Sequence, residues 1–122
     1  MSEIIEKIIA ISGRNPYLCY QCGMCSAACP MAEYMDLLPH QVIRLVQLRH
    51  RDLDRIESVW TCVACMACVD KCPRHVDPGI IFEAIRLLTL RKGIDKADYQ
   101  KLTDIEEAPS MAIVALSRKM TG

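Results

Sequence analysis

Two runs of cysteines with identical spacing constrain this chain more than any other feature of its sequence. The first run, CYQCGMCSAACP, extends from Cys19 to Pro30, and the second, CVACMACVDKCP, extends from Cys62 to Pro73. In both runs two, two and three residues separate the four cysteines, and a proline follows the last one. The runs hold all eight cysteines of the 122 residues and repeat after 43 residues, from Cys19 to Cys62. Two units are too few for a solenoid, so the repeat predicts one pseudo-symmetric domain.

The cysteine spacing is typical of a cubane iron–sulfur site. A cubane cluster needs four thiolates that converge from different directions, and three cysteines spaced by two residues can wrap a loop around three corners of one cube. In bacterial ferredoxins with two clusters, the fourth cysteine of each run binds the other cluster. The pattern therefore predicts two [4Fe–4S] clusters as cofactors. The predicted ligands are Cys19, Cys22, Cys25 and Cys72 for cluster 1, and Cys62, Cys65, Cys68 and Cys29 for cluster 2.

The residues around the cysteines favour the same interpretation. Pro30 and Pro73 lack an N–H and have a fixed φ, so each turns the chain away after the exchanged ligand. We expect Met24 and Met66 to shield the clusters from water, which affects their potential, and Trp60 to pack beside a cluster. Several of the intervening residues are small enough for backbone N–H groups to approach the cluster sulfurs: Gly23, Ser26, Ala27, Ala28, Ala64 and Ala67.

Other uses of clustered cysteines explain the pattern less well. Two zinc sites would account for the CxxC pairs but leave the third regularly spaced cysteine of each run without a reason. A disulfide framework is disfavoured because we expect a cytoplasmic protein, whose thiols stay reduced. Radical chemistry on S-adenosylmethionine usually uses cysteines spaced by three and then two residues, and in that register the third position is Ala32 or His75. Because all eight cysteines are assigned as ligands, none is left as a nucleophile.

The composition argues against nucleic-acid binding and against a direct membrane span. Basic and acidic residues number 15 each, so the formal charge is zero, whereas a polyanion-binding module normally has a basic excess. No stretch approaches the roughly 20 apolar residues that span a bilayer. The N-terminus lacks the basic start of a signal peptide. These features predict a cytoplasmic location. The histidines at positions 40, 50 and 75 are expected at the surface.

Helical periodicity and capping signals predict an all-α chain. Helices are expected over residues 2–12, ended by Gly13, over 36–50, with Pro39 in the first turn, and over 54–60. The next begins at Asp77 and Pro78, as N-cap and first position, and ends at Gly93. The expected buried positions are Ile4, Ile5, Ile8, Ile9, Leu38, Val42, Leu45, Val46, Ile81, Ala84, Ile85 and Leu88.

The C-terminal tail carries weaker signals. Residues 103–106 fit a capping box, although Pro109 soon follows. The run SMAIVALSRK, residues 110–119, contains six adjacent apolar residues that can form a helix. Exposed apolar patches often mark interfaces, so we expect this helix to dock on a partner. No segment alternates with a period of two, and no strands are expected.

The chain resembles the helical ferredoxin fold of the iron–sulfur subunits of fumarate reductase and succinate dehydrogenase, and more narrowly the C subunit of heterodisulfide reductase. The resemblance lies in CYQCGMCSAACP, in LLPHQVIRLVQL between the runs, and in SVWTCVACMACVDKCPRHVDPGIIFEAIRLL at the second run. It covers roughly residues 15–93. It implies an all-α helical ferredoxin domain with two [4Fe–4S] clusters over residues 1–93, followed by a tail over 94–122.

The resemblance also implies a function. The C subunit of that family relays single electrons between the A-type subunit, a flavoprotein that also carries clusters, and the B-type subunit, which is catalytic. Paired adjacent cysteines, which bind the unusual clusters of the catalytic B-type subunit, are absent here, so no catalytic residues are expected. The alternatives are the iron–sulfur subunit of another oxidoreductase, of the glycerol-3-phosphate, glycolate or succinate type, and a zinc-binding structural module.

Overall fold

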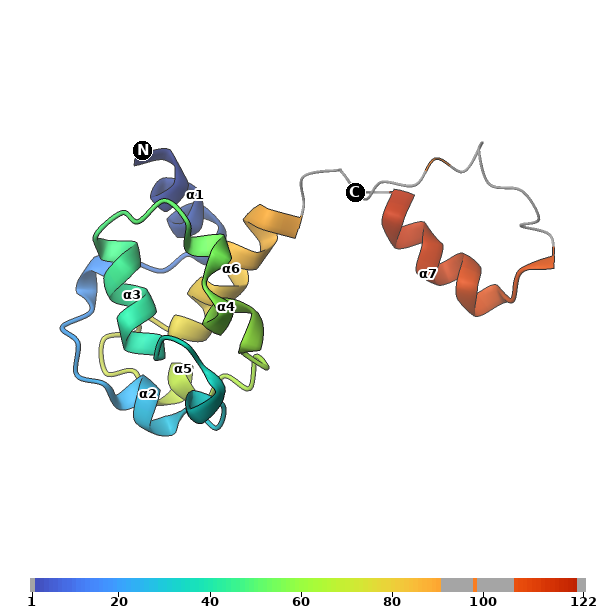
Figure 1. The fold of residues 1–122 in the computed structure, drawn as a ribbon. Coiled ribbons are helices and arrows are strands. Elements are labelled where there is room, and N and C mark those ends of the chain that lie inside the picture. Colours follow the sequence, from blue (N-terminus) through green and yellow to red (C-terminus); the bar gives the residue numbers. More distant parts are fainter. Residues whose placement is uncertain (1, 91–97, 99–106, 121–122) are drawn as a thin grey trace. The chain divides into compact units, whose positions relative to one another are not determined.

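The computed structural model describes residues 2–90, 98 and 107–120, and the chain divides into two compact units, Met1–Thr89 and Leu90–Gly122. Figure 1 shows the first unit as a set of short helices joined by loops. Along the chain these are α1 (Ser2–Ser12), η1 (Pro16–Leu18), α2 (Met24–Ala28), η2 (Ala32–Tyr34), α3 (Pro39–Gln47), η3 (Leu53–Arg55), α4 (Glu57–Thr61), α5 (Ala67–Lys71) and α6 (Pro78–Leu90). No strand occurs in the described residues, and the all-α prediction is confirmed.

Helix α1 has the predicted bounds. Gly13 ends it with a φ of 65° and donates its N–H to the carbonyl of Ile9 over 2.8 Å. A positive φ is readily adopted by glycine because it has no Cβ. Ile5 and Ile8 are buried as expected, but Ile4 is 42% exposed. The buried face of α1 is therefore narrower than the isoleucine pattern predicts.

Helix α3 is shorter at both ends than the predicted range of 36–50. It begins at Pro39, which occupies the first helical turn. Asp36 lies before it, and its Oδ1 accepts a hydrogen bond from the backbone N–H of Ser58 over 2.8 Å while Oδ2 accepts one from Glu57 over 3.3 Å. These N–H groups are the first two of α4, so Asp36 caps the N-terminus of a helix that follows 21 residues later.

The helix predicted over 54–60 is interrupted. Ile56 adopts an extended conformation, with φ −72° and ψ 118°, between η3 and α4. Its side chain is 7% exposed and belongs to the apolar core. Burial of this isoleucine thus divides the predicted helix into two short pieces.

The start of α6 at Pro78 confirms the predicted first position, but the predicted role of the Asp77 side chain is wrong. Asp77 has a φ of 54° and is 2% exposed, and its Oδ2 forms an ion pair with Nε of Arg14 over 2.8 Å. Its Oδ1 has no hydrogen-bond partner in the described part of the chain. The carboxylate therefore binds the N-terminal segment instead of the helix N–H groups. The predicted end at Gly93 lies outside the described residues.

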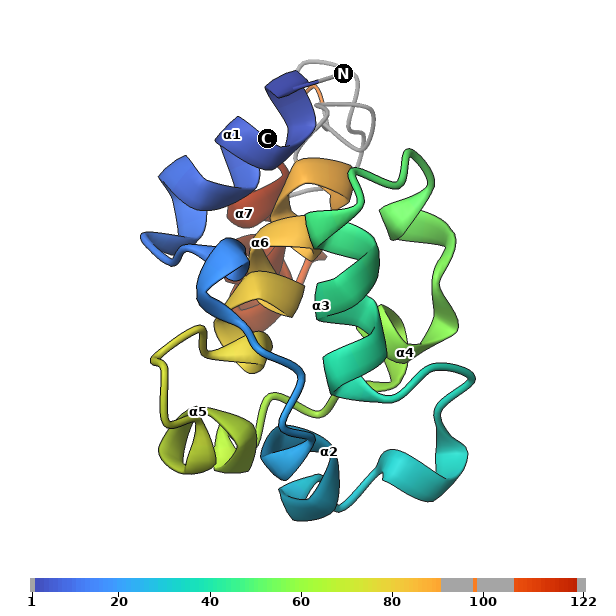
Figure 2. The ribbon, with the colours of Figure 1, turned by 90° about the vertical axis from the view of Figure 1, so that its left-hand side faces the viewer.

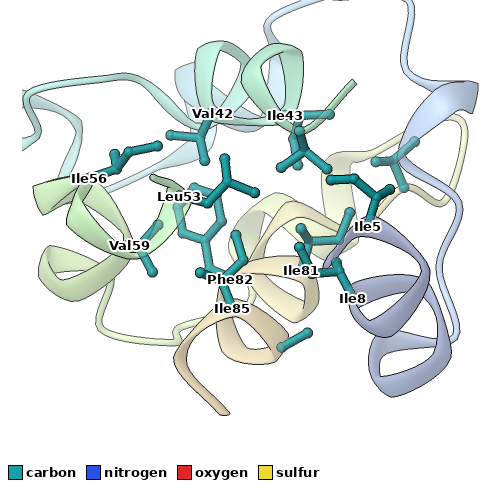
Figure 3. Close-up of a cluster of buried hydrophobic side chains, with 13 residues drawn as sticks. Ile5, Ile8, Val42, Ile43, Leu53, Ile56, Val59, Ile81, Phe82 and Ile85 are labelled. Carbon is teal, nitrogen blue, oxygen red and sulfur yellow. The ribbon is translucent and has the colours of Figure 1, made fainter. Parts of the chain in front are cut away.

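One apolar core lies between α1, α3, α4 and α6. Figure 3 shows isoleucines of α1, α3 and α6 pointing toward one another, with Phe82 beside Leu53 and Val59. Ile43, Leu53 and Phe82 are buried although the periodicity did not select them, whereas Leu38, Leu45 and Leu88 are only partly buried. At one end of this core, α2 and α5 pack side by side (Figure 2). Half-buried Cys19, Cys62 and Cys72 pack against the core.

The second unit contains α7 (Ser110–Met120), which confirms the helix predicted in the apolar run of the tail. Met111 and Val114 on this helix are 83% and 68% exposed. The capping box predicted at 103–106 lies outside the described residues. Within the described ranges, no helix has both the length and the apolar character needed to cross a membrane.

Candidate iron–sulfur centres

The two cysteine runs have nearly the same backbone conformation. Cys19 and Cys62 each follow a short helical turn and are extended, with φ and ψ of −69° and 124° in one and −59° and 121° in the other. Cys29 and Cys72 each end a five-residue helix, α2 or α5, with φ of −74° in both and ψ of 119° and 113°. The sequence repeat is therefore also a structural repeat.

Left-handed residues recur at equivalent positions within the runs. Gln21 and Ala64 have φ of 65° and 55°, and Gly23 and Met66 have φ of 77° and 61°. Turns of this kind aim successive backbone N–H groups into one concavity, and such concavities hold anions, including many iron–sulfur sites. Three of these four residues are not glycine, for which a positive φ is uncommon. The loops thus have the backbone that an anionic cluster with thiolate ligands requires.

The third cysteines lie close together between the two halves of the repeat. Cys25 is in α2 and Cys68 is in α5, the two helices that pack side by side. Burial raises the pKa of Cys25, and it raises the pKa of Cys68 to about 11, with Cys62, Cys25 and Cys65 adding to the shift of Cys68. Buried, closely spaced thiols of this kind become thiolates when positively charged iron binds them.

Four of the cysteines line one hollow, which encloses about 390 Å³ of space not filled by atoms. They come from both runs and are the four ligands that were predicted for cluster 2: Cys29, Cys62, Cys65 and Cys68. The rest of the lining is almost entirely apolar and consists of Pro30, Met31, Met35, Pro39, Val63, Met66, Pro78, Gly79 and Phe82. The hollow therefore brings Cys29 of the first run to the three leading cysteines of the second.

Gly79 is a site residue that sequence reasoning missed. A Cβ at this position would lie 3.2 Å from Sγ of Cys68 and 3.1 Å from Sδ of Met66. The backbone N–H of Gly79 also hydrogen bonds to Cys68 and opposes the rise of its pKa. The close approach of α6 to the cysteine loop thus requires glycine, and the Pro78-Gly79 pair at a predicted helix start was the available signal.

The remaining four cysteines surround a more polar region. The backbone N–H and the side-chain amide of Gln21 each lie 3.4 Å from Sγ of Cys19, and the N–H of Val76 lies 3.3 Å from Sγ of Cys72. Such hydrogen bonds stabilise negative charge on ligand sulfurs. This part of the structure thus supplies N–H donors to one cysteine of each run.

Tyr20 relates Cys22 of the first run to Cys72 of the second. The Cys22 thiolate is the main cause that raises the pKa of Tyr20, and Cys72 adds to it. The guanidinium of Arg74 lies over the tyrosine ring, 5.3 Å from its centre. One exposed tyrosine thus has a cysteine from each run in its surroundings.

The other predicted side chains differ in placement. Met66 lines the hollow, whereas Met24 is 48% exposed. Trp60 is 42% exposed and donates its Nε1–H to the carbonyl of Asp54, and its packing beside a cluster stays a prediction. His50 and His75 are exposed as expected, but His40 is half-buried, with Nδ1 2.6 Å from Oγ of Ser26.

Residues 16–76, which include both cysteine runs and both halves of the repeat, match the model of the 4Fe-4S dicluster domain. This chain belongs to the 4Fe-4S dicluster domain family. Its cofactors are two [4Fe–4S] clusters, because the matched segment contains all eight cysteines.

The resemblance to the C subunit of heterodisulfide reductase is also confirmed by individual relatives. The chain is 36% identical over 76 residues to the C subunit of the ferredoxin:CoB-CoM heterodisulfide reductase of Methanosarcina acetivorans, which covers 62% of this chain and 31% of the relative. It is 31% identical over 109 residues to the C2 subunit of the H(2)/formate:CoB-CoM heterodisulfide,ferredoxin reductase of Methanococcus maripaludis, covering 86% and 59%. With the second C-type iron-sulfur subunit of the CoB--CoM heterodisulfide reductase of Methanocaldococcus jannaschii the identity is 33% over 97 residues, covering 76% and 52%. The chain spans about a third to two thirds of the length of these curated relatives.

Proposed function

We propose that this chain is an electron-transfer subunit of a heterodisulfide-reductase-like complex. It relays single electrons through its two [4Fe–4S] clusters, between a flavin-bearing partner that resembles the A-type subunit and a catalytic partner that resembles the B-type subunit. The single observation that carries the proposal is the duplicated cysteine site, in a chain whose relatives are named as C subunits of heterodisulfide reductases. When bound, the clusters supply reversible one-electron oxidation and reduction.

The ligand sets are part of this proposal. Cluster 1 is bound by Cys19, Cys22, Cys25 and Cys72, and cluster 2 by Cys62, Cys65, Cys68 and Cys29. The shared hollow of Cys29 with the second run supports the second set. The position of Tyr20 beside both Cys22 and Cys72 supports the first.

The chain's own residues hold the clusters and limit the access of water. The left-handed residues of each run direct N–H groups toward the ligand sulfurs. The apolar lining of the hollow lowers the local dielectric constant, which affects the reduction potential of a cluster. Since all eight thiols serve as ligands, none is free for bond-making at a substrate. The chemical step therefore belongs to a partner protein.

The tail over residues 94–122 is assigned as a partner-docking segment that follows the cluster domain of residues 1–93. Residues 110–115 are exposed, and they include Met111 and Val114. A helix with such an apolar surface is suited to dock on a partner protein.

The test begins with anaerobic reconstitution of the full chain with iron and sulfide. Eight iron and eight sulfide per chain, with two reduced clusters in electron paramagnetic resonance (EPR) spectra, are expected. Tight zinc with little iron would refute the assignment. The second step is affinity purification from the native host. Recovery of a flavoprotein together with a protein that carries paired adjacent cysteines is expected, whereas a dehydrogenase of the glycerol-3-phosphate, glycolate or succinate type would identify a different complex.

A further inference from the structure

Two long side chains hold equivalent carbonyl groups in the two halves of the repeat. The amide Nε2 of Gln47 in α3 donates to the carbonyls of Pro16 and Cys19, over 2.9 Å each. Arg86 in α6 donates from Nε to the carbonyl of Val59 over 2.6 Å and from Nη2 to the carbonyl of Cys62. The two carbonyl pairs are related by the 43-residue repeat, since Pro16 corresponds to Val59 and Cys19 to Cys62.

The two donors also occupy the same position in their helices. Gln47 lies eight residues after Pro39, which begins α3, and Arg86 lies eight residues after Pro78, which begins α6. The loop before each proline differs in length, so alignment on the 43-residue repeat alone would not pair them. The structure therefore identifies a correspondence that the cysteine repeat does not reveal.

These hydrogen bonds act on the first cysteine of each run. The carbonyls of Pro16 and Val59 belong to the short helices η1 and α4, and Cys19 and Cys62 are the residues that follow these helices. Carbonyls at a helix C-terminus have no partner within the helix and need one from elsewhere. By bonding two carbonyls at once, each donor restrains the backbone that aims the first ligand.

The donors differ in charge. Glutamine is neutral, whereas arginine is always protonated in proteins. Arg86 is half-buried, so solvent screens its charge less than that of a surface arginine. A positive charge close to an iron–sulfur cluster favours the reduced form, which carries one more negative charge.

We propose that Gln47 and Arg86 are paired positioning residues for the first ligand of each cluster, and that the charge of Arg86 raises the reduction potential of the cluster that Cys62 binds. The inference rests on the two-cluster assignment of the proposed function. It does not depend on the exchange of Cys29 and Cys72, because Cys19 and Cys62 bind different clusters under either pairing.

The experiment uses the full chain, reconstituted anaerobically and titrated with dithionite while EPR spectra are recorded. Each cluster takes up one electron from the reductant. Cys22→Ser and Cys65→Ser assign the two signals, because these exposed cysteines occupy equivalent positions in different runs. Every variant is compared with the wild type cluster by cluster, so the contribution of Arg74 near Tyr20 is the same throughout.

Three substitutions at position 86 separate charge from hydrogen bonding. Arg86→Lys keeps the charge, Arg86→Gln keeps an amide donor of the kind found at position 47, and Arg86→Met keeps neither. We expect the potential of the Cys62 cluster to fall in Arg86→Gln relative to Arg86→Lys, with a roughly tenfold change in the reduction equilibrium, equivalent to about 59 mV for one electron. We expect Arg86→Met to lose iron or to broaden the signal of that cluster, and Arg86→Gln to restore both.

The reciprocal variant Gln47→Arg introduces the charge in the other half. It is expected to raise the potential of the Cys19 cluster and to leave the other potential unchanged. Equal potentials in Arg86→Lys and Arg86→Gln would overturn the role of the charge. Full iron content and an unchanged signal in Arg86→Met would overturn the positioning role. If Arg86→Met does not fold, Arg86→Lys, Arg86→Gln and Gln47→Arg still decide the role of the charge. A wild-type chain without two clusters would instead refute the proposed function.

Discussion

Met66 adopts the same left-handed backbone conformation as Gly23, its counterpart in the first cysteine run, with φ of 61° against 77°. This conformation costs a residue with a side chain about 1–2 kcal/mol. The thioether of Met66 lines the hollow formed by Cys29 and the second run. The second run therefore keeps a strained residue where its side chain covers the cysteines, and the first run has glycine instead.

Replacement of Gly23 by alanine should lower the free energy of unfolding by about 1 kcal/mol, because only the backbone conformation opposes the new methyl group. No described atom lies within 4 Å of the position that its Cβ would occupy. Gly13→Ala is the matched control, since Gly13 has a φ of 65° and equally open surroundings. Anaerobic denaturant unfolding of both variants measures the loss, and wild-type stability in Gly23→Ala would contradict the prediction.

Gly79→Ala should disturb one cluster and spare the other. Alanine favours a helix by about 1 kcal/mol over glycine, but its methyl group would press against Cys68 and Met66 at 3.2 and 3.1 Å. We expect a shifted EPR signal or lower occupancy for the cluster that Cys68 binds, and an unchanged signal for the other. Wild-type spectra for both clusters would show that the loop yields to the methyl group without effect.

The exchange of the fourth cysteines can be tested with serine variants. Under the exchanged pairing, Cys25→Ser and Cys29→Ser damage different clusters, and the spectrum of Cys29→Ser resembles that of Cys65→Ser. The shared hollow of Cys29 and Cys65 is the physical reason. EPR of the reduced variants makes the comparison, using those that retain at least one cluster. Damage to the same cluster in Cys25→Ser and Cys29→Ser would mean that each run binds its own cube.

Asp36→Ala should cost about 1 kcal/mol of stability at pH 7, the usual loss for an N-cap. Burial alone would raise the pKa of Asp36, but hydrogen bonds from Ser58, Leu37 and Glu57 outweigh it and lower the pKa below 3.8. The native state therefore favours the carboxylate, so its contribution is complete at neutral pH and is lost as the pH falls through the lowered pKa.

Denaturant unfolding of wild type and Asp36→Ala at several pH values tests this sign. The stability difference should stay constant from pH 7 to about 5 and shrink below about pH 4. Asp70→Ala serves as the control, because Asp70 is 81% exposed and its contact with Lys71 spans 3.8 Å. A difference that grows on acidification would contradict the assigned hydrogen bonds.

Deletion of residues 108–122 should leave iron content unchanged and weaken binding to the partner proteins. The deletion removes α7, whose exposed residues include Met111 and Val114. Iron analysis and pull-down with the partners measure the two effects. Unchanged partner affinity would refute docking, and loss of folding would mean that the helix completes the core of the chain.

Local signals were enough to predict much of the fold. Gly13, Pro39 and Pro78 define where helices end or begin, because each restricts or frees the backbone through its own covalent structure. The all-α class and the two clusters also followed from local patterns. The interruption at Ile56 did not, because burial against distant residues decides its conformation.

The site was less predictable than the ligands. Cysteine spacing identifies the eight thiols, but Gly79 approaches Cys68 only through the packing of α6 on the second run. Gln47 and Arg86 bond to carbonyls that lie 28 and 24 residues before them. No local pattern encodes such pairings, because they depend on how the helices are placed in three dimensions.

The hollow beside α2 and α5 has a consequence for the biosynthesis of the protein. Its lining extends along the chain from Cys29 to Phe82, and no continuous part of that segment encloses it alone. A ribosome must therefore translate both cysteine runs and the start of α6 before this hollow can form. Iron and sulfide enter this hollow late, after about two thirds of the 122 residues have been translated.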